Sequence, residues 1–355
     1  MDRTCFPDRP LPDWARPLEF KFTPTDYMFL SQTDADGQWD EGQIVPLQDL
    51  TLSPAAAALN YGQAVFEGMK AFRTPQGKVV LFRPEDNARR FRRSAARLAM
   101  PPYPAPGFVR AVHQVVKANA RWVPPYDPHR ALHQQNSLYI RPVMIGSGTV
   151  LGVRPAPQYT FYIFVSPVGP YLPGEGRVIV LDSTHRAAQH STGDVKAAGN
   201  YAGTLLPHEI ARSQGYKDVL YLDAQHSRYV QELGSSNFFA ILRDGTLATP
   251  PLDGAILPGI TRDSVMAIAR ELFGWKVVER PLDIEEVLAQ AEEAFFTGTA
   301  AVLQPITVIH YRGRDYPIGT GKAERANRLF QCLVEIQTCQ RPDPFGWVEE
   351  VEIVP

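Results

Sequence analysis

A single proline- and glycine-rich run, residues 167–176, is the feature that most limits how this chain can fold. It reads PVGPYLPGEG, and neither a helix interior nor a central strand tolerates so many prolines and glycines. The 355 residues are enough for two domains, each with its own core. We therefore predict a small N-terminal domain over residues 1–168, an interdomain loop over 169–178 and a larger domain over 179–355.

The first half of the chain mixes short strands with two helices. Apolar residues at helical spacing, Ala88, Phe91, Ala95 and Leu98, predict a helix that Pro101 ends. Runs of β-branched and aromatic residues predict strands. The expected strands cover residues 44–47, 79–82, 138–145 and 159–165, and the expected helices cover 86–100 and 108–122.

The second half is richer in strands. Three apolar runs predict an antiparallel meander, with Asp244 and Gly245 forming a hairpin turn after the third. Pro207 predicts a kink or a late start in the helix that follows Lys196, and Asp283 with Glu286 has the spacing of a capping box. The expected strands are 177–181, 219–222, 229–232, 237–242, 294–297 and 302–309, and the expected longer helices are 197–214, 262–273 and 322–338. Because strands and helices do not alternate regularly, the predicted fold class is α+β.

Charge and cysteine content exclude several classes of protein. The formal net charge of −2 creates no field that would attract nucleic acid or an anionic membrane. No stretch approaches the roughly 18 apolar residues that span a bilayer, and residues 1–14 lack the apolar core of a secretory signal. The cysteines are few and scattered, at Cys5, Cys332 and Cys339, as expected of reduced thiols in a cytoplasm.

The segment DVKAAGNY, residues 194–201, places Lys196 directly before three small residues. A lysine amine that attacks a carbonyl needs a partly dry site and an open approach. Small neighbours would let a flat molecule come close to the backbone, and Gly199 with Asn200 favours a sharp turn. The same segment also fits an ordinary surface loop, so it decides nothing alone.

Glu232 ends a predicted strand and is followed by Gly234, Ser235 and Ser236. A fixed carboxylate that faces a pyridine nitrogen would keep that nitrogen protonated, and a protonated ring is a strong electron sink. A strand that ends in a polar turn has the same residue pattern.

Two glycine-led segments suggest anion binding. Gly259, Ile260 and Thr261 open a predicted helix, where unpaired N–H groups and the helix dipole attract negative charge; Thr261 could equally be the helix N-cap. Residues 298–300, with the sequence GTA, offer a hydroxyl and two N–H groups between predicted strands. A tight β-turn would look the same.

Two arginines could meet further anionic groups. Arg90 lies in the basic helical segment 89–93, and since successive helical residues differ by about 100°, only some of its arginines can border the buried face. One of these arginines could bind a phosphate. Tyr139 and Arg141 share one face of a predicted strand, where they could receive a carboxylate. The alternative for the arginine-rich segment is a solvated helix face, and the alternative for Tyr139 and Arg141 is a cross-strand salt bridge.

Together these features meet the four needs of pyridoxal phosphate: an amine, a carboxylate for the ring nitrogen, an anion site for the phosphate and an arginine for the substrate. The chain resembles the branched-chain amino acid aminotransferases of fold-type IV, in their longer, eukaryotic-like branch. Five ordered motifs carry this resemblance between about Phe20 and Trp347. They are 66–72 (FEGMKAF), 138–142 (LYIRP), the Lys196 motif, the Glu232 motif and 257–262 (LPGITR).

The resemblance implies a role for each matching residue. Lys196 would be the catalytic Schiff-base lysine, Glu232 would pair with the ring nitrogen and Tyr201 would bind the ring oxygen. The implied phosphate and other cofactor contacts are Arg90, Ser235, Ile260, Thr261 and Thr299. The implied substrate contacts are Phe20, Tyr61, Phe66, Tyr139 and Tyr171 for the apolar side chain, Arg141 for a distal carboxylate, and the backbone of Thr299 and Ala300 for the α-carboxylate.

The resemblance also implies architecture and activity. We expect a small α/β domain, a larger domain with a mainly antiparallel sheet or barrel, the cofactor between them, and a homodimer. The expected reaction is reversible transamination of leucine, isoleucine and valine with 2-oxoglutarate. Ala301 and Gln304 replace a redox-active cysteine pair, Ser235 replaces a more usual threonine, and Pro24 replaces a residue that is often aromatic.

Two alternatives remain at this stage. Another fold-type IV reaction, such as D-amino acid transamination or aminodeoxychorismate cleavage, would use the same scaffold. A nucleic-acid or partner-binding protein could instead use the arginine-rich helix at 89–93.

Overall fold

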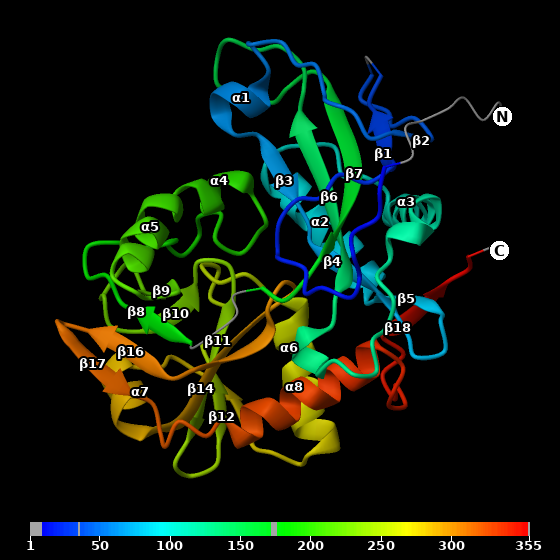
Figure 1. The fold of residues 1–355 in the computed structure, drawn as a ribbon. Coiled ribbons are helices and arrows are strands. Elements are labelled where there is room, and N and C mark those ends of the chain that lie inside the picture. The colour runs from blue at the N-terminus through cyan, green and yellow to red at the C-terminus, as the bar shows by residue number, and fades with distance from the viewer. Residues whose placement is uncertain (1–8, 35, 172–175, 354–355) are drawn as a thin grey trace. The chain divides into compact units, whose positions relative to one another are not determined.

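The computed structural model describes residues 9–34, 36–171 and 176–353 (Figure 1). The chain divides into two compact units, Met1–Tyr171 with Glu335–Pro355 (unit 1) and Leu172–Val334 (unit 2). We predicted residues 179–355 as one domain, whereas the final segment groups with unit 1. The reason is strand pairing: β18 (Val348–Val351) adds antiparallel to β5 (Val79–Phe82). Part of the predicted loop, residues 172–175, and Cys5 lie outside the described residues.

Unit 1 is built on an antiparallel sheet, and its described strands run in the order β18-β5-β4-β6-β7-β1-β2, with β3 also paired to β6. The longest pairing joins β6 to β7 over ten residues of each strand. This pairing matters for the site, because β6 carries Tyr139 and Arg141. The strand bounds are β1 Tyr27–Gln32, β2 Gln43–Pro46, β3 Ala64–Phe66, β4 Met69–Arg73, β6 Ser137–Gly146 and β7 Tyr159–Val168.

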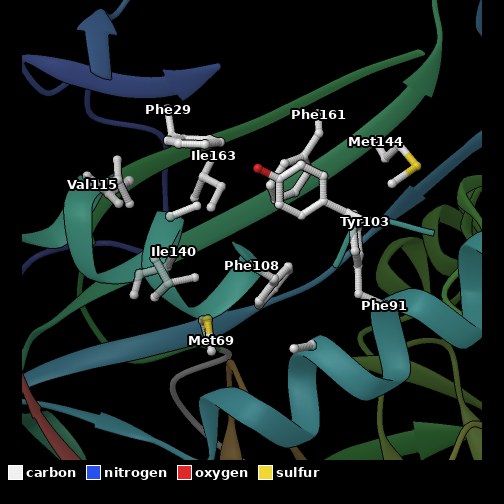
Figure 2. Close-up of a cluster of buried hydrophobic side chains, with 14 of the residues drawn as sticks. Phe29, Met69, Phe91, Tyr103, Phe108, Val115, Ile140, Met144, Phe161 and Ile163 are labelled. Carbon is white, nitrogen blue, oxygen red and sulfur yellow. The ribbon is translucent and has the colours of Figure 1, made fainter. Parts of the chain in front are cut away.

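The helices of unit 1 pack their apolar stripes onto this sheet. Phe91 of α2 (Pro84–Arg97) and Phe108 of α3 (Ala105–Ala118) meet Phe161 of β7, with ring centroids 5.3 and 5.9 Å from that of Phe161. Figure 2 shows these rings turned toward one another inside the core. The predicted stripe is confirmed, since Phe91 is fully buried. The shorter helices are α1 (Ala57–Tyr61) and the 3₁₀ turns Ala120–Trp122 and Leu132–Gln134.

Unit 2 holds a larger sheet, in which most neighbouring strands are antiparallel and β8–β9, β8–β16 and β12–β13 are parallel. The predicted meander is confirmed as β9, β10 and β11, and the mixed helices and sheets of both units fit the predicted α+β class. The strands are β8 Arg177–Ile179, β9 Asp218–Leu222, β10 Val230–Leu233, β11 Asn237–Leu242, β12 Leu247–Thr249, β13 Val277–Glu279, β14 Ala291–Gly298, β15 Val302–Ile306, β16 Val308–Tyr311 and β17 Arg314–Pro317.

Several helices differ from the sequence-based expectation. The predicted helix 197–214 is two helices, α4 (Ala198–Ala202) and α5 (Leu205–Ser213). Pro207 lies in the first turn of α5, where a missing N–H costs nothing. The remaining helices are α6 Ile260–Ala267, continued by a π-helical turn Ile268–Leu272, then α7 Ile284–Gln290 and α8 Glu324–Gln337. None of the helices in the described part of the chain is long and apolar enough to cross a membrane.

The capping box predicted before α7 is only half formed. The Asp283 carboxylate caps the helix by accepting the N–H of Glu285 at 2.9 Å. Glu286 binds Arg280 instead of reaching back to the cap, because a guanidinium offers a carboxylate a stronger, charge-assisted partner.

Candidate active site

Lys196 lies in unit 2, just before α4, and its amine is already paired with Tyr201. The Nζ atom donates to the Tyr201 hydroxyl at 2.9 Å and lies 5.0 Å from the centre of its ring. Lys196 is half-buried, while its neighbours Val195 and Ala197 are buried. The two residues predicted to act on one cofactor are therefore brought together by a single turn of chain.

Asn200 explains how this turn is held, and it corrects one expectation. We predicted that Gly199 and Asn200 form a sharp turn, but both lie inside α4. The Asn200 amide instead donates to the backbone oxygens of Thr192 at 2.6 Å and Val195 at 2.9 Å. A helical residue thus fixes the loop that leads into Lys196.

Glu232 is a buried carboxylate on β10, not part of a solvated turn. Its Oε1 atom lies 2.5 Å from Nη2 of Arg186 and accepts the N–H of Leu257 at 3.1 Å. Its Oε2 atom accepts the Asn237 amide at 2.8 Å. Since only 3% of Glu232 is exposed, these donors replace the water that an ionised carboxylate requires.

Burial and charge act in opposite directions on Glu232. Burial raises the pKa of this carboxyl above its ordinary value, and the charges of Arg186, Lys196 and Arg262, with the Leu257 N–H, oppose that rise. Burial disfavours the charged form, whereas nearby cations and N–H donors favour it. The protonation state of Glu232 therefore depends on its immediate neighbours.

The start of α6 has the features of an anion site. Gly259 is the residue before the helix, and within the described part of the chain no side chain caps this end. Thr261 lies inside the first turn and is buried, so the alternative that Thr261 is the N-cap is wrong. The N–H groups of this first turn carry the positive end of the helix dipole.

Asn237 ties this helix start to Glu232. Besides Glu232, its amide donates to the Leu257 oxygen at 2.9 Å. A Cβ atom at position 259 would lie 2.0 Å from the Asn237 side-chain oxygen. Only glycine fits there, so the spacing between the carboxylate and the helix start is fixed by close packing.

The turn at residues 298–300 joins β14 to β15, as predicted. A Cβ atom at Gly298 would lie 3.1 Å from the Ser236 hydroxyl and 3.4 Å from the Ser235 oxygen. The turn therefore packs against the polar segment that follows Glu232. Thr299 and Ala300 are half-buried, and Ser235 is exposed.

In unit 1, one arginine is surrounded by aromatic rings. Arg141 donates to the Tyr139 hydroxyl at 3.1 Å, and its guanidinium lies 5.0 Å from the Phe66 ring centre. Phe20 packs edge-on against Tyr139 and Tyr171, at 5.3 and 4.9 Å. Among the described residues no carboxylate forms an ion pair with Arg141, and its Nε is buried without a partner, so the cross-strand salt bridge is excluded. We call Phe20, Phe66, Tyr139, Arg141 and Tyr171 the aromatic cluster.

Tyr61 and Arg90 make different contacts. The Tyr61 hydroxyl donates to the backbone oxygen of Leu151, and 42% of this tyrosine is exposed. Arg90 is buried, whereas Arg89, Arg92 and Arg93 of the same segment are exposed, as helical geometry predicted. It binds both oxygens of buried Glu67, at 2.7 and 2.8 Å. Arg90 belongs to unit 1, whereas Ile260, Thr261 and Thr299 belong to unit 2.

The profile of one protein family, the amino-transferases of class IV, matches residues 64–309. This match covers most of the chain and includes every predicted site residue except Phe20 and Tyr61. The chain belongs to the class IV aminotransferases.

Relatives of this class IV aminotransferase indicate its branch. It is 44% identical to the chloroplastic branched-chain-amino-acid aminotransferase 5 of Arabidopsis thaliana, over 96% of this chain and 80% of that protein. It is 40% identical to the Helicobacter pylori branched-chain-amino-acid aminotransferase, over 96% and 98%. The branched-chain enzyme of Thermobaculum terrenum, solved in its PLP form, superimposes with a TM-score of 0.76 at 25% identity, covering 93% of this chain and 99% of that one. The chain is a pyridoxal-phosphate-dependent transaminase of the branched-chain type.

The residues of unit 2 fit this cofactor. Its aldehyde needs an amine, which Lys196 could supply beside Tyr201. Its ring nitrogen needs a buried carboxyl partner, which Glu232 could supply. Its phosphate needs N–H donors, which the start of α6 could supply, since no described side chain caps this helix.

Sequence reasoning missed several residues around these sites. Arg186 and Asn237 bind Glu232, and Glu67 holds Arg90. Lys70 of β4 lies directly opposite Tyr139 of β6, so both side chains share one face of the sheet. Arg186 precedes Glu232 by more than 40 residues, and no periodic pattern relates the two. For Glu67 and Lys70 a signal existed, since both lie in the FEGMKAF motif.

Proposed function

We propose that this transaminase moves the amino group of L-leucine, L-isoleucine or L-valine to 2-oxoglutarate, reversibly, giving branched-chain 2-oxo acids and L-glutamate. The observation that carries the proposal is Arg141 within the aromatic cluster. Aromatic walls favour an aliphatic side chain, and a guanidinium with a buried, unpaired nitrogen favours a carboxylate. A transaminase that alternates between these substrates needs both properties.

Cofactor binding is assigned within the same proposal. Pyridoxal 5′-phosphate supplies, when bound, an aldehyde that condenses with amines and a protonated ring that withdraws electrons from the substrate α-carbon. Lys196 would hold the aldehyde, Glu232 the ring nitrogen and Tyr201 the ring oxygen. Phosphate contacts are proposed for Arg90, Ser235, Ile260, Thr261 and Thr299.

Lys196 would also move the proton of the reaction. Its Nζ atom, once released by the incoming amino acid, would take the proton from the substrate α-carbon and deliver it to a second carbon, the one that belonged to the cofactor aldehyde. Tyr201, 2.9 Å from this nitrogen, would limit the directions in which the amine can point. A lysine on a short, anchored loop suits a base that must reach two positions.

Substrate binding divides between apolar and polar groups. Phe20, Tyr61, Phe66, Tyr139 and Tyr171 are proposed to contact the apolar side chain. Arg141 would accept the distal carboxylate of glutamate, because a carboxylate left unpaired among aromatic rings would be costly. The backbone of Thr299 and Ala300 would hold the α-carboxylate.

The competing functions are less well supported. In the arginine-rich helix, Arg90 is buried and paired with Glu67, and Arg89 is paired with Asp86, so neither of these charges faces solvent without a counter-charge. D-amino acid transamination and aminodeoxychorismate cleavage are not favoured by relatives that are named branched-chain enzymes.

We also propose that the enzyme is a cytoplasmic homodimer. An apolar groove of about 740 Å³ on unit 1 is lined by residues such as Phe22, Met28 and Leu59, and 60% of Phe22 and 62% of Leu59 are exposed. A second copy of the chain would remove this surface from water. Light scattering should give about twice the monomer mass of 39.6 kDa.

The proposal is tested with a panel of amino donors at saturating 2-oxoglutarate. Leucine, isoleucine and valine should be turned over far faster than D-alanine or aminodeoxychorismate. Borohydride reduction of the loaded enzyme should place the phosphopyridoxyl mass on the peptide that contains Lys196. Lys196→Ala should fold and lose turnover, and substantial remaining transamination would overturn the assignment of this lysine.

A further inference from the structure

Arg186 is a buried cation next to the proposed cofactor site, and nothing in the mechanism above uses it. It lies between β8 and α4, with 4% of its side chain exposed. Its Nη2 atom lies 2.5 Å from Oε1 of Glu232. The same atom donates to the backbone oxygens of Gly193, at 3.1 Å, and Ala255. One nitrogen therefore joins the loop before Lys196 and the segment before α6 to the carboxylate.

The donors around Glu232 are unevenly shared between its two oxygens. Oε1 accepts the Leu257 N–H and is in ion-pair contact with Arg186, whereas Oε2 receives only the Asn237 amide among the described residues. A carboxylate oxygen accepts about two hydrogen bonds. With an N–H donor and a cation both on Oε1, Oε2 is the oxygen that keeps the capacity to accept one more N–H.

We propose that Arg186 is a positioning residue of this enzyme: it holds Glu232 as an anion, with Oε1 occupied and Oε2 available to the cofactor ring nitrogen. The inference rests on the role proposed above for Glu232. It assigns Arg186 no contact with substrate or cofactor and makes it act through the carboxylate.

The other cations near Glu232 are each held by other groups. Lys196 donates to Tyr201, and Arg262 pairs with Glu279 at 2.8 Å. Arg186 is the cation in direct contact. Because burial raises the pKa of Glu232, removing this contact would favour the protonated carboxyl. Tyr221 lies near Arg186, and since burial raises the pKa of its phenol, this side chain stays neutral and supplies no charge of its own.

Protonation of Glu232 would determine whether the cofactor ring nitrogen carries a proton. A carboxylate accepts an N–H from a protonated ring, whereas a carboxylic acid donates its own proton to a neutral ring nitrogen. The neutral ring withdraws electrons less strongly from the α-carbon. Loss of Arg186 should therefore be visible in ring protonation, which a purely structural role would leave unchanged.

The test loads wild-type protein and the variants R186Q, R186K and E232Q with pyridoxal phosphate carrying ¹⁵N in the ring. The ring-nitrogen chemical shift is then followed across pH 6–9. We expect wild type to show a protonated ring throughout, R186K to lose the ring proton toward the upper end of this pH range, and R186Q to shift toward neutral pyridine already at neutral pH. The leucine half-reaction of R186Q should slow at least tenfold. The control R212Q removes an exposed arginine paired with Glu209 and should match wild type.

A double variant distinguishes the proposed role of Arg186 from the proposed role of Glu232. In E232Q the ring should be neutral, and R186Q/E232Q should match E232Q if Arg186 acts only through the carboxylate. If R186Q keeps a protonated ring and merely melts at a lower temperature, the positioning role is overturned. If E232Q itself keeps a protonated ring, the proposed role of Glu232 fails instead.

Two further measurements test the positioning role of Arg186 if R186Q binds the cofactor poorly. In the cofactor-free protein, R186Q should show the infrared carbonyl band of a buried protonated carboxyl, and R186Q/E232Q should lack it. If R186Q does not fold, R186K decides, because its shorter side chain cannot keep all three contacts. Its ring should lose the proton over a lower pH range than wild type, and an unchanged profile would overturn the proposal.

Discussion

The hydroxyl of Tyr139 occupies the space that a side chain at Gly68 would need. A Cβ atom at position 68 would lie 2.1 Å from this hydroxyl, and the same hydroxyl accepts the Arg141 guanidinium at 3.1 Å. Gly68, on the segment between β3 and β4, has no side chain, and this leaves room for the Tyr139 hydroxyl to pair with the Arg141 guanidinium on β6. The positions of Tyr139 and Arg141 within the aromatic cluster depend on this contact.

Gly68→Ala should therefore displace Tyr139 and, with it, Arg141. We expect a loss of about 1–3 kcal/mol in the free energy of unfolding, and a KM for 2-oxoglutarate that rises more than the KM for leucine. Gly152→Ala is the matched control, because a Cβ there meets no atom within 4 Å. Unaltered kinetics in a folded Gly68→Ala enzyme would show that Tyr139 does not position Arg141.

Arg141→Met should separate the two kinds of substrate. It keeps an apolar side chain of similar length but removes the cation, so kcat/KM for glutamate and 2-oxoglutarate should fall roughly 100-fold, the usual loss for one partner of a buried charge pair. The half-reaction with leucine should change less than tenfold. Equal losses for both substrates would mean that the charge has a structural role only.

Glu67→Gln should destabilise unit 1, because it leaves Arg90 buried without a full counter-charge. Breaking a buried ion pair costs about 3–5 kcal/mol, and Glu67 is fully buried with Asn87 and Arg90 as its partners. Chemical denaturation of Glu67→Gln measures the loss. The exposed pair Lys78–Glu350 is the reference, and Lys78→Ala should change stability far less than Glu67→Gln does. Similar effects of the two substitutions would argue against a buried pair.

Lys70→Met should make stability less dependent on pH. Burial lowers the pKa of Lys70 to about 8, from an ordinary value of 10.5. Below pH 8 the amine is charged in both the folded and unfolded states, so the full burial penalty applies. Between pH 8 and 10.5 the folded protein binds fewer protons, and wild-type stability rises with pH.

The methionine variant should accordingly be more stable than wild type below pH 8, by roughly 3 kcal/mol at most. The difference should disappear as the pH approaches 10.5. Denaturation curves at pH 7 and pH 10 measure both values. A difference that stays constant with pH would mean that burial does not lower the pKa of Lys70.

The sequence alone determined the local structure and the kinds of chemical group available. Helical spacing identified the buried stripe of α2. It also predicted that only some arginines of the arginine-rich segment are buried. Strand alternation placed Tyr139 and Arg141 on one face, and the Lys196 motif brought amine and phenol together within six residues. These results follow from short-range geometry, which a pattern of neighbouring residues encodes directly.

Tertiary structure decided which partner each of these groups has. Glu232 could have ended a solvated strand, and only folding placed it against Arg186, Asn237 and Leu257. The pairing of Glu67 with Arg90 and the addition of β18 to the sheet of unit 1 were equally undetermined. Each joins residues that lie far apart in the chain or have several possible partners, and burial selects among those partners because an unpaired charge is costly away from water.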